Sequence, residues 1–119
     1  ILALWAAYYE DLVVGAVSCK PDPDDENRLY IMTLGCLAPY RRLGIGRQLL
    51  NHILSIVRED GKFTSVCLHV QINNEDAIEF YKAHGFEIKA TRENYYQKVT
   101  PADAHWLVLE LNKEDGADN

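Results

Sequence analysis

The stretch "RLYIMTLGCLAPYRRLGIG", residues 28–46, decides the fold. It begins with an apolar run over 28–37 that is typical of a strand, and Gly35 within this run indicates a bulge or a close approach to the backbone. A proline and a basic turn with two glycines follow. The stretch therefore predicts a strand, a turn and the start of a helix, and it places neighbouring arginines in a chain whose formal net charge is −6.

The helix after this turn is predicted over 46–59, with Gly61 as its C-cap. A helix N-terminus offers unpaired N–H groups and a partial positive charge, and glycines let a phosphate come close to the backbone. The turn is therefore a candidate site for a pyrophosphate. It is neither a Walker A loop nor a GxGxxG fingerprint, because the next glycine after Gly46 is Gly61. Taken alone, the pattern also fits an ordinary solvated loop.

The rest of the chain alternates between strand and helix patterns. Strands are predicted over 2–8, 12–19, 65–71, 86–92 and 104–111, and a second helix from Asn73 or Asn74 to about His84. The order β-β-β-α-β-α-β-β predicts one α/β or α+β domain, a mixed sheet flanked by helices. The polar segment "KPDPDDEN", residues 20–27, is predicted to be a solvated loop, and residues 112–119 a flexible tail.

Composition excludes several classes of function. The acidic balance argues against a broad affinity for nucleic acid or anionic membranes, which would need a basic face. Cys19, Cys36 and Cys67 are widely spaced and form no CxxC pair, so we expect reduced strand or core residues and no zinc site. No apolar run of 18 residues is present. We therefore expect a cytoplasmic protein that binds any anion locally.

A second segment turns these observations into a family resemblance. "NNEDAIEFYKAHGFE", residues 73–87, has the pattern N-x-x-A-x-x-x-Y-x-x-x-G-F, and residues 41–46 have the pattern R-x-x-G-x-G. Together they resemble the two cofactor segments of the GNAT superfamily of acetyl-CoA-dependent N-acetyltransferases. This resemblance covers residues 28–90. It implies the GNAT fold and acetyl-CoA bound by Leu34, Arg41, Arg42, Leu43, Gly44, Ile45, Gly46, Arg47, Asn74 and Tyr81. Without it, the residue at 74 is a plain helix cap and that at 81 a core aromatic.

Within the superfamily, the chain most resembles the NatE (San) type of N-terminal acetyltransferase. The matching stretches are residues 28–46, "LHVQINNEDAIEFY" (68–81), "NYY" (94–96) and "PADAH" (101–105). The resemblance implies acetylation of the α-amine of protein N-termini that keep Met, of the Met-Leu type. It also implies action near the ribosome in the cytoplasm, possible presence in the nucleus, and association with the NatA complex, without a metal, nucleic acid or membrane.

Acetyl transfer to an amine needs a neutral nucleophile, a proton acceptor and donors for the oxyanion. An α-amine has a pKa near 7.7–8.0, so a histidine can accept its proton. His69 lies on the polar side of its predicted strand, and the resemblance makes it the base with Tyr30 as its partner. The residues alone leave open a structural histidine and a buried tyrosine.

The resemblance also implies a slot for the substrate peptide. Met32 forms part of its floor, and Tyr95 and Tyr96 line it, although adjacent tyrosines also fit plain packing over a core edge. If no bulge intervenes, Tyr30, Met32 and Leu34 point to one face of their strand. A bulge at Gly35 would direct backbone N–H groups over 34–37 at the thioester carbonyl.

The chain departs from the family at its N-terminus. The resemblance implies a strand and two helices before residue 1, and we expect an N-terminally truncated domain whose first strand, 2–8, is an exposed apolar edge prone to self-association. Three classes of function stay open: an N-terminal α-amine acetyltransferase, a GNAT enzyme for lysine or small amines, and a non-catalytic module that binds acetyl-CoA or a NatA-type partner.

Overall fold

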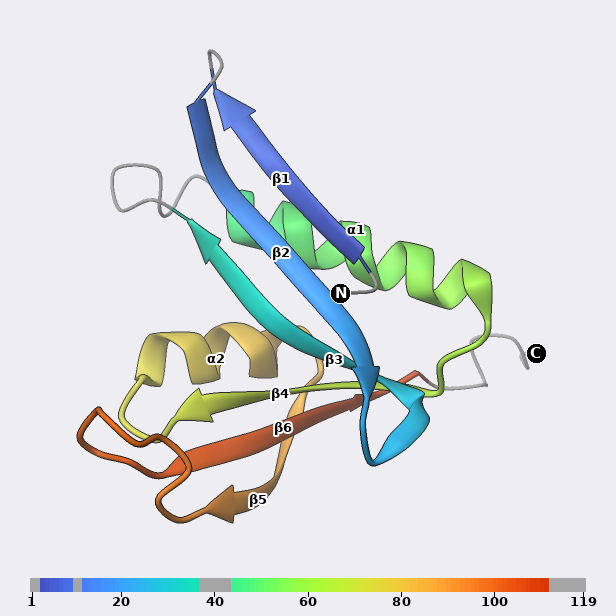
Figure 1. Ribbon diagram of the computed structural model, residues 1–119. Coiled ribbons are helices and arrows are strands. Elements are labelled where there is room, and N and C mark those ends of the chain that lie inside the picture. Colours follow the sequence, from blue (N-terminus) through green and yellow to red (C-terminus); the bar gives the residue numbers. More distant parts are fainter. Residues whose placement is uncertain (1–2, 10–11, 37–43, 112–119) are drawn as a thin grey trace. The chain divides into compact units, whose positions relative to one another are not determined.

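The computed structural model describes residues 3–9, 12–36 and 44–111, with side chains over 16–32, 34–35 and 44–111. The chain divides into two compact units, Ile1–Thr64 and Ser65–Asn119. Along the chain, the strands and helices follow the predicted order β-β-β-α-β-α-β-β (Figure 1). No helix among the described residues has both the length and the apolar character needed to cross a membrane.

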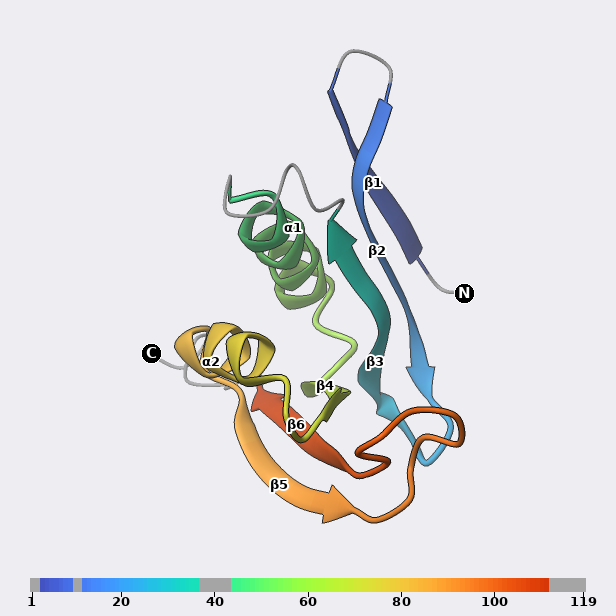
Figure 2. The same ribbon diagram turned by 90° about the vertical axis from the view of Figure 1, so that its left-hand side faces the viewer.

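The first unit is an antiparallel sheet of three strands with one helix. β1 (Ala3–Tyr9) pairs with β2 (Leu12–Asp22), and β2 pairs with β3 (Asp25–Cys36). α1 (Ile45–Asp60) contacts all three strands and lies on one side of them, as Figure 2 shows. Its buried residues recur at helical spacing, as predicted, and are Leu49, Leu50, Ile53, Leu54 and Val57. The sheet contributes the buried side chains of Val17, Cys19, Leu29 and Ile31.

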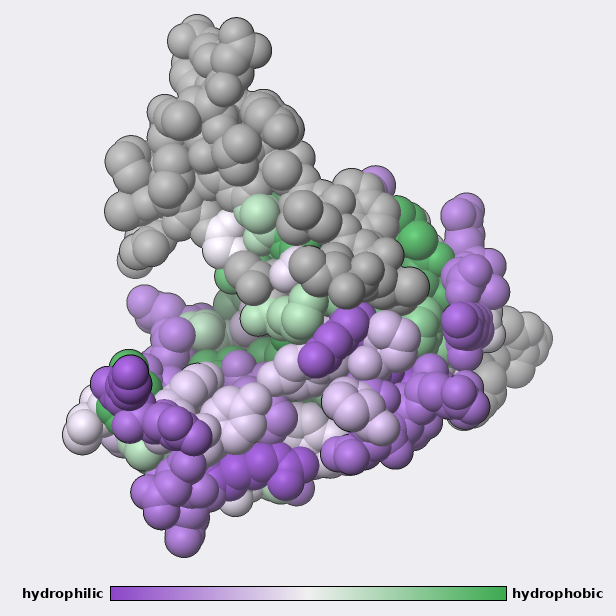
Figure 3. Space-filling view, in the orientation of Figure 1, coloured by the Kyte–Doolittle hydropathy of each residue, from purple (hydrophilic) through white to green (hydrophobic). Residues whose placement is uncertain are grey.

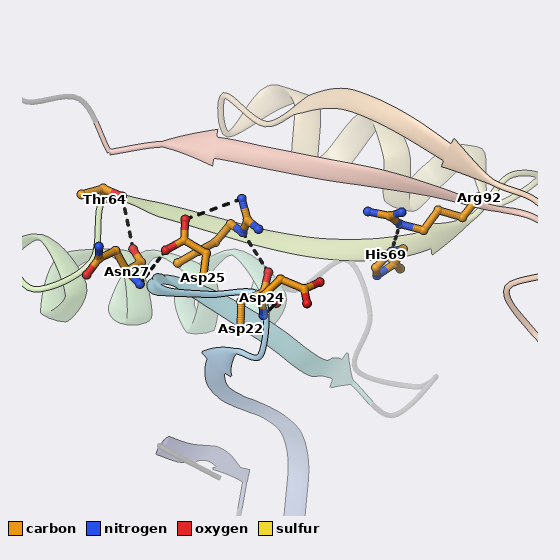
Figure 4. A network of polar contacts seen from close by, with 8 residues as sticks. Asp22, Asp24, Asp25, Asn27, Thr64, His69 and Arg92 are labelled. Atoms are coloured by element: carbon orange, nitrogen blue, oxygen red, sulfur yellow. Dashed lines mark hydrogen bonds and ion pairs between the residues drawn. The ribbon is translucent and has the colours of Figure 1, made fainter.

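The predicted solvated loop over 20–27 is for the most part a hairpin. β2 and β3 leave only Pro23 and Asp24 as the turn between them. Asp22 explains the difference, because its Oδ1 accepts the N–H of Asp24 at 3.0 Å and its Oδ2 pairs with Nε of Arg28 at 2.8 Å (Figure 4). These contacts hold strand geometry in a segment whose prolines and acids favour a loop.

β3 carries a bulge, but at Met32 and not at Gly35. Two consecutive residues of β2 pair with Thr33 and Ile31, so the register skips Met32. Gly35 stands in regular register opposite Ala16. The prediction of a bulge at Gly35 is therefore wrong, because the extra residue is inserted three positions earlier in the strand.

The bulge also changes which side chains share a face. Residues directly opposite each other in an antiparallel pair project to the same face. Leu34 is opposite Val17 and Tyr30 is opposite Lys20. Since Val17 and Lys20 are three residues apart on a strand with alternating faces, Leu34 and Tyr30 lie on opposite faces. The shared face of Tyr30, Met32 and Leu34 was predicted on the condition that no bulge intervenes, and the bulge at Met32 removes that condition.

The second unit consists of three antiparallel strands and one helix. β4 (Ser65–Gln71) and β5 (Glu87–Arg92) both pair with β6 (Ala104–Glu110), which gives the order β4-β6-β5. α2 (Glu75–Ala83) lies to one side of these strands in Figures 1 and 2. The core residues of this unit include Val66, Cys67, Leu68, Val70, Tyr81, Phe86, Leu107 and Leu109.

The outer strand of this unit is polar and exposed. Every residue of β5 except Ala90 is exposed, and the surface over β5 and β6 in Figure 3 is largely hydrophilic. Among the cysteines whose side chains are described, Cys19 and Cys67 are buried and form no disulfide, as predicted, and burial raises the pKa of the Cys19 thiol.

Candidate active site

The predicted site residues fall in both units. β3 carries Tyr30, Met32 and Leu34, and α1 with its N-cap carries Gly44, Ile45, Gly46 and Arg47. In the second unit, His69 lies on β4, Asn74 and Tyr81 at α2, and Tyr95 and Tyr96 after β5. Arg41, Arg42 and Leu43 lie outside the described residues. The predicted proton-transfer pair of Tyr30 and His69 joins one residue from each unit and stays a prediction.

His69 is held between an aromatic ring and a guanidinium. Its ring stacks on Tyr95, with 4.1 Å between the centroids and 15° between the planes. Nε of Arg92 donates a hydrogen bond to its Nε2 at 3.0 Å (Figure 4). The structure therefore brings the predicted base and one residue of the predicted peptide slot into direct contact.

This hydrogen bond assigns the roles of the ring nitrogens of His69. An arginine N–H can only donate, so Nε2 must offer its lone pair. A neutral imidazole has one N–H, which then sits on Nδ1. His69 thus presents a proton-accepting nitrogen, which is what a general base requires.

The two tyrosines of the predicted slot are mutually packed. The Tyr95 and Tyr96 rings meet edge to face, with 5.0 Å between centroids. Tyr95 is 39% exposed, whereas Tyr96 is half-buried. Burial, with the neighbouring Tyr95 as a smaller cause, raises the pKa of the Tyr96 hydroxyl. The Tyr96 hydroxyl is therefore a neutral donor at physiological pH.

The loop that carries these tyrosines is tied to the end of β4. Nε2 of Gln71 donates to the carbonyl of Pro101 at 2.8 Å, and the N–H of Ile72 donates to the carbonyl of Asp103 at 3.1 Å. The carboxylate of Asp103 accepts the N–H of Asn94 at 2.8 Å, which supports the positive φ of 55° at Asn94. These bonds position Tyr95 and Tyr96 from both ends of the loop.

Sequence reasoning missed Arg92, Trp106 and the loop contacts of Gln71 and Asp103. Arg92 lies over the Trp106 ring, with 5.1 Å from Cζ to the centroid, and it touches His69 although β6 separates their strands. No local pattern encodes this contact, because it depends on the strand order β4-β6-β5.

The N-terminus of α1 suits an anion. Gly44 is its N-cap with φ 83° and makes no side-chain cap hydrogen bond, and no acidic residue stands in the first turn of the helix. The positive φ explains the glycine, since a Cβ there would meet only Nη2 of Arg47, at an ordinary 3.5 Å. The backbone N–H groups at the start of α1 have no bond to a cap side chain, and Arg47 adds a positive charge. Both features fit the pyrophosphate that the sequence predicts.

The second predicted cofactor segment shows structural roles. Oδ1 of Asn74 accepts the N–H of Ala77 at 3.2 Å and so caps α2. Tyr81 is buried, its ring meets those of Phe80 and Phe86, and burial raises its pKa to about 12. Any cofactor role of these two residues stays a prediction. Among the described residues, no group of three or more His, Cys, Asp or Glu could hold a metal ion.

The chain belongs to the GNAT acetyltransferase family, whose profile matches residues 2–86. It is 60% identical over 106 residues to N-alpha-acetyltransferase 50 of Danio rerio, covering 88% of this chain and 63% of that protein. It is 58% identical over 108 residues to the probable N-acetyltransferase san of Drosophila melanogaster, covering 90% of this chain and 59% of that protein. The chain thus spans about three fifths of the length of these curated relatives.

Solved structures agree with this assignment. Arabidopsis thaliana Naa50 in complex with the bisubstrate analogue CoA-Ac-MVNAL is 46% identical with a TM-score of 0.83, over 91% of this chain and 72% of that chain. The ribosomal-protein-S18-alanine N-acetyltransferase of Escherichia coli has a TM-score of 0.80 at 22% identity, over 92% of this chain and 69% of that chain, and shares the fold. The predicted GNAT fold is confirmed.

Proposed function

We propose that the chain is the catalytic domain of an N-terminal acetyltransferase, which transfers the acetyl group of acetyl-CoA to the α-amine of protein N-termini. The relative from Danio rerio is named for this activity, and the structure of Arabidopsis thaliana Naa50 holds an analogue that joins CoA to a peptide. The observation that carries the proposal is the proton-accepting Nε2 of His69, in a ring stacked on Tyr95.

The residues of the chain supply the proton chemistry. When bound, acetyl-CoA supplies the acetyl group as a thioester. The α-amine, with a pKa near 7.7–8.0, must be neutral to attack, and Nε2 of His69 can take its proton directly or through a water. The stack on Tyr95 fixes the plane of the imidazole. In this proposal, Tyr30 orders the water on the path of the proton.

The cofactor proposal rests on the start of α1. Arg41, Arg42, Leu43 and Gly44 precede this helix, and its first residues are Ile45, Gly46 and Arg47. Backbone N–H groups there would hold the pyrophosphate, and the arginines add attraction. Leu34, Asn74 and Tyr81 are proposed to complete the acetyl-CoA site.

The proposed substrate is a protein N-terminus that keeps its Met, of the Met-Leu type. The analogue bound to Arabidopsis thaliana Naa50 carries the sequence MVNAL, which also begins with Met. Met32, Tyr95 and Tyr96 are proposed to line the peptide slot. A NatA-type complex as partner and a cytoplasmic location are further parts of this proposal and rest on the family resemblance.

Release of free CoA from acetyl-CoA tests the proposal. One peptide begins with Met-Leu and has a free α-amine, with every lysine blocked. Its matched control has the same sequence with a blocked α-amine and one free lysine. We expect release with the first peptide alone.

The other outcomes are equally informative. Release with both peptides would replace the proposal with a broader amine acetyltransferase. Absence of release with either, in a chain that binds acetyl-CoA by calorimetry, would leave a cofactor-binding module without turnover and refute the proposed activity of these 119 residues.

A further inference from the structure

Arg92 reaches across a whole strand to contact His69. β6 lies between β4 and β5, so the two residues stand on strands that are not neighbours. Adjacent strands are about 4.8 Å apart, so the two side chains and the hydrogen bond between them together span roughly 10 Å. Its guanidinium lies over the Trp106 ring, and its Nε ends 3.0 Å from Nε2 of His69 (Figure 4). An arginine is long enough for this reach.

The strand register fixes this contact on one face of the unit. His69 is opposite Trp106 across β4 and β6, and Trp106 is opposite Ala90 across β6 and β5. Arg92 stands two residues beyond Ala90 and returns to the same face. The pairing of three strands, and not the flexibility of one side chain, therefore brings Arg92 beside His69.

The contact occupies the nitrogen that the proposed reaction uses. Nε2 of His69 has one in-plane lone pair, which here accepts the N–H of Arg92. The amine proton of a substrate, or a bridging water, would need the same lone pair. Among the described residues, no carboxylate is paired with Arg92, and its contacts are His69 and Trp106. The guanidinium can therefore leave Nε2 and keep its cation–π contact with Trp106.

We propose that Arg92 is a positioning residue for the acetyl transfer. It holds His69 in the Nδ1–H tautomer, so that Nε2 carries the lone pair. When the substrate amine binds, the hydrogen bond from Arg92 breaks and Nε2 accepts the proton of the amine. The proposal rests on the proposed function of His69 as the proton acceptor. No side chain at position 92 is needed for the chemistry itself.

Three substitutions separate this role from packing and from charge. Arg92→Met keeps an unbranched apolar stem beside Trp106 and removes every N–H donor. Arg92→Lys restores a cationic donor. Lys89→Met is the matched control, because it removes a cation from the same exposed strand, where Lys89 pairs with Glu87 at 3.2 Å.

The first readout is the ¹⁵N chemical shift of the histidine ring nitrogens in the full chain. The His69 signals are assigned by their loss in His69→Gln. His84 is an internal reference, since its Nδ1 is 2.9 Å from the carbonyl of Phe80, which only accepts, so that this nitrogen carries the proton. We expect His69 to match His84 in the unsubstituted protein and in Lys89→Met. Arg92→Met should move the chemical shifts of both ring nitrogens of His69 away from those of His84.

The second readout is steady-state turnover with the Met-Leu peptide. We expect Arg92→Met to lower kcat about tenfold, a part of the 100-fold or more that a general base contributes, with KM for acetyl-CoA unchanged. Arg92→Lys should recover most of kcat, and Lys89→Met should retain all of it. An unchanged or raised kcat in Arg92→Met overturns the proposal, as do unchanged ring shifts.

The two proposals fail in different ways. If the unsubstituted chain shows no turnover, the proposed function fails, whereas the ring shifts still report whether Arg92 sets the tautomer of His69. A change in the His69 ¹⁵N chemical shifts in Arg92→Met then supports the role of Arg92 in setting the tautomer, and unchanged chemical shifts refute it.

Discussion

Replacing Gly44 with alanine is expected to weaken acetyl-CoA binding, and Gly61→Ala provides a control at the other end of the same helix. Both glycines cap α1 in the left-handed region, with φ 83° and 71°. A Cβ at Gly61 meets nothing within 4 Å, and one at Gly44 meets only Nη2 of Arg47 at 3.5 Å. Neither substitution therefore creates a clash, and both impose the same backbone cost.

The magnitude follows from that backbone cost. An L-residue in the left-handed region costs about 1–2 kcal/mol, and alanine offsets about 0.4–1 kcal/mol of this by restricting the unfolded chain. Each variant should lose about 1 kcal/mol, which is about 4 °C in Tm for a chain of this size. Of the two glycines, only Gly44 lies where the protein backbone is proposed to contact the pyrophosphate of acetyl-CoA. There we expect Kd for acetyl-CoA to rise at least tenfold, or about 1.4 kcal/mol.

Thermal unfolding gives the two stability losses, and isothermal titration of acetyl-CoA gives the two dissociation constants. Because both glycines belong to the same helix, the comparison does not depend on whether the two units unfold together. An affinity for acetyl-CoA that is unchanged in both Gly44→Ala and Gly61→Ala would refute a pyrophosphate site at the start of α1. Equal losses of affinity in both would attribute the effect to stability alone.

Three further predictions concern the second unit. His69→Gln should lower kcat about 100-fold or more and leave Kd for acetyl-CoA unchanged by calorimetry, and a retained rate would remove His69 from the mechanism. Asp103→Ala removes the acceptor for the N–H of Asn94 and should raise KM for the peptide about fivefold. Asp103→Asn keeps an acceptor and should leave KM unchanged. Equal KM values in the two variants would contradict the role of this hydrogen bond in positioning the loop. Burial raises the pKa of Tyr81 to about 12, above the value near 10 of an unfolded tyrosine, so its contribution to stability is complete below about pH 10 and is lost as the pH rises through 12. In denaturant unfolding, the free energy of unfolding should therefore fall less between about pH 9 and pH 12 in Tyr81→Phe than in the unsubstituted protein. Parallel curves of unfolding free energy against pH for the two proteins would exclude this linkage.

Local patterns predicted the elements well where the periodicity is unbroken. The buried face of α1 and the glycine at its C-terminus are fixed by spacing within one helix, and Gly61 donates its N–H to Val57 as a C-cap does. β4 was predicted with its observed bounds, because strongly apolar residues alternate with other residue types in its sequence. Such patterns require no knowledge of what the element packs against.

The prediction failed where contacts between strands decide the structure. The hairpin at 20–27 depends on Asp22, whose carboxylate joins the turn to Arg28 across the two strands. Prolines and acids in the sequence favour a loop, and only the paired strands show the compensating contact. The same holds for Arg92, whose position beside His69 requires β6 to be inserted between two strands that precede it in the chain.

The roles of the candidate site residues stay predictions. His69 and Tyr95 were assigned to one site by family resemblance, and their stacked rings agree with that proximity. The cap role of Asn74 followed from its residue type alone. The arginines at 41 and 42, which first drew attention to the turn, lie outside the described residues, so their part in anion binding depends on the titrations above.

The bulge at Met32 shifts the alternation of buried and exposed residues along β3 by one position. Before it, residues such as Leu29 and Ile31 belong to the buried set at odd positions. After it, Leu34 shares the face of Val17 at an even position. The alternation of this strand therefore follows odd positions before Met32 and even positions after it. Deletion of Met32 would make the pairs Ile31–Cys19 and Thr33–Ser18 contiguous and would leave the faces of both segments unchanged. One inserted residue thus lets two segments with opposite sequence alternation present their apolar residues on the same face of the strand.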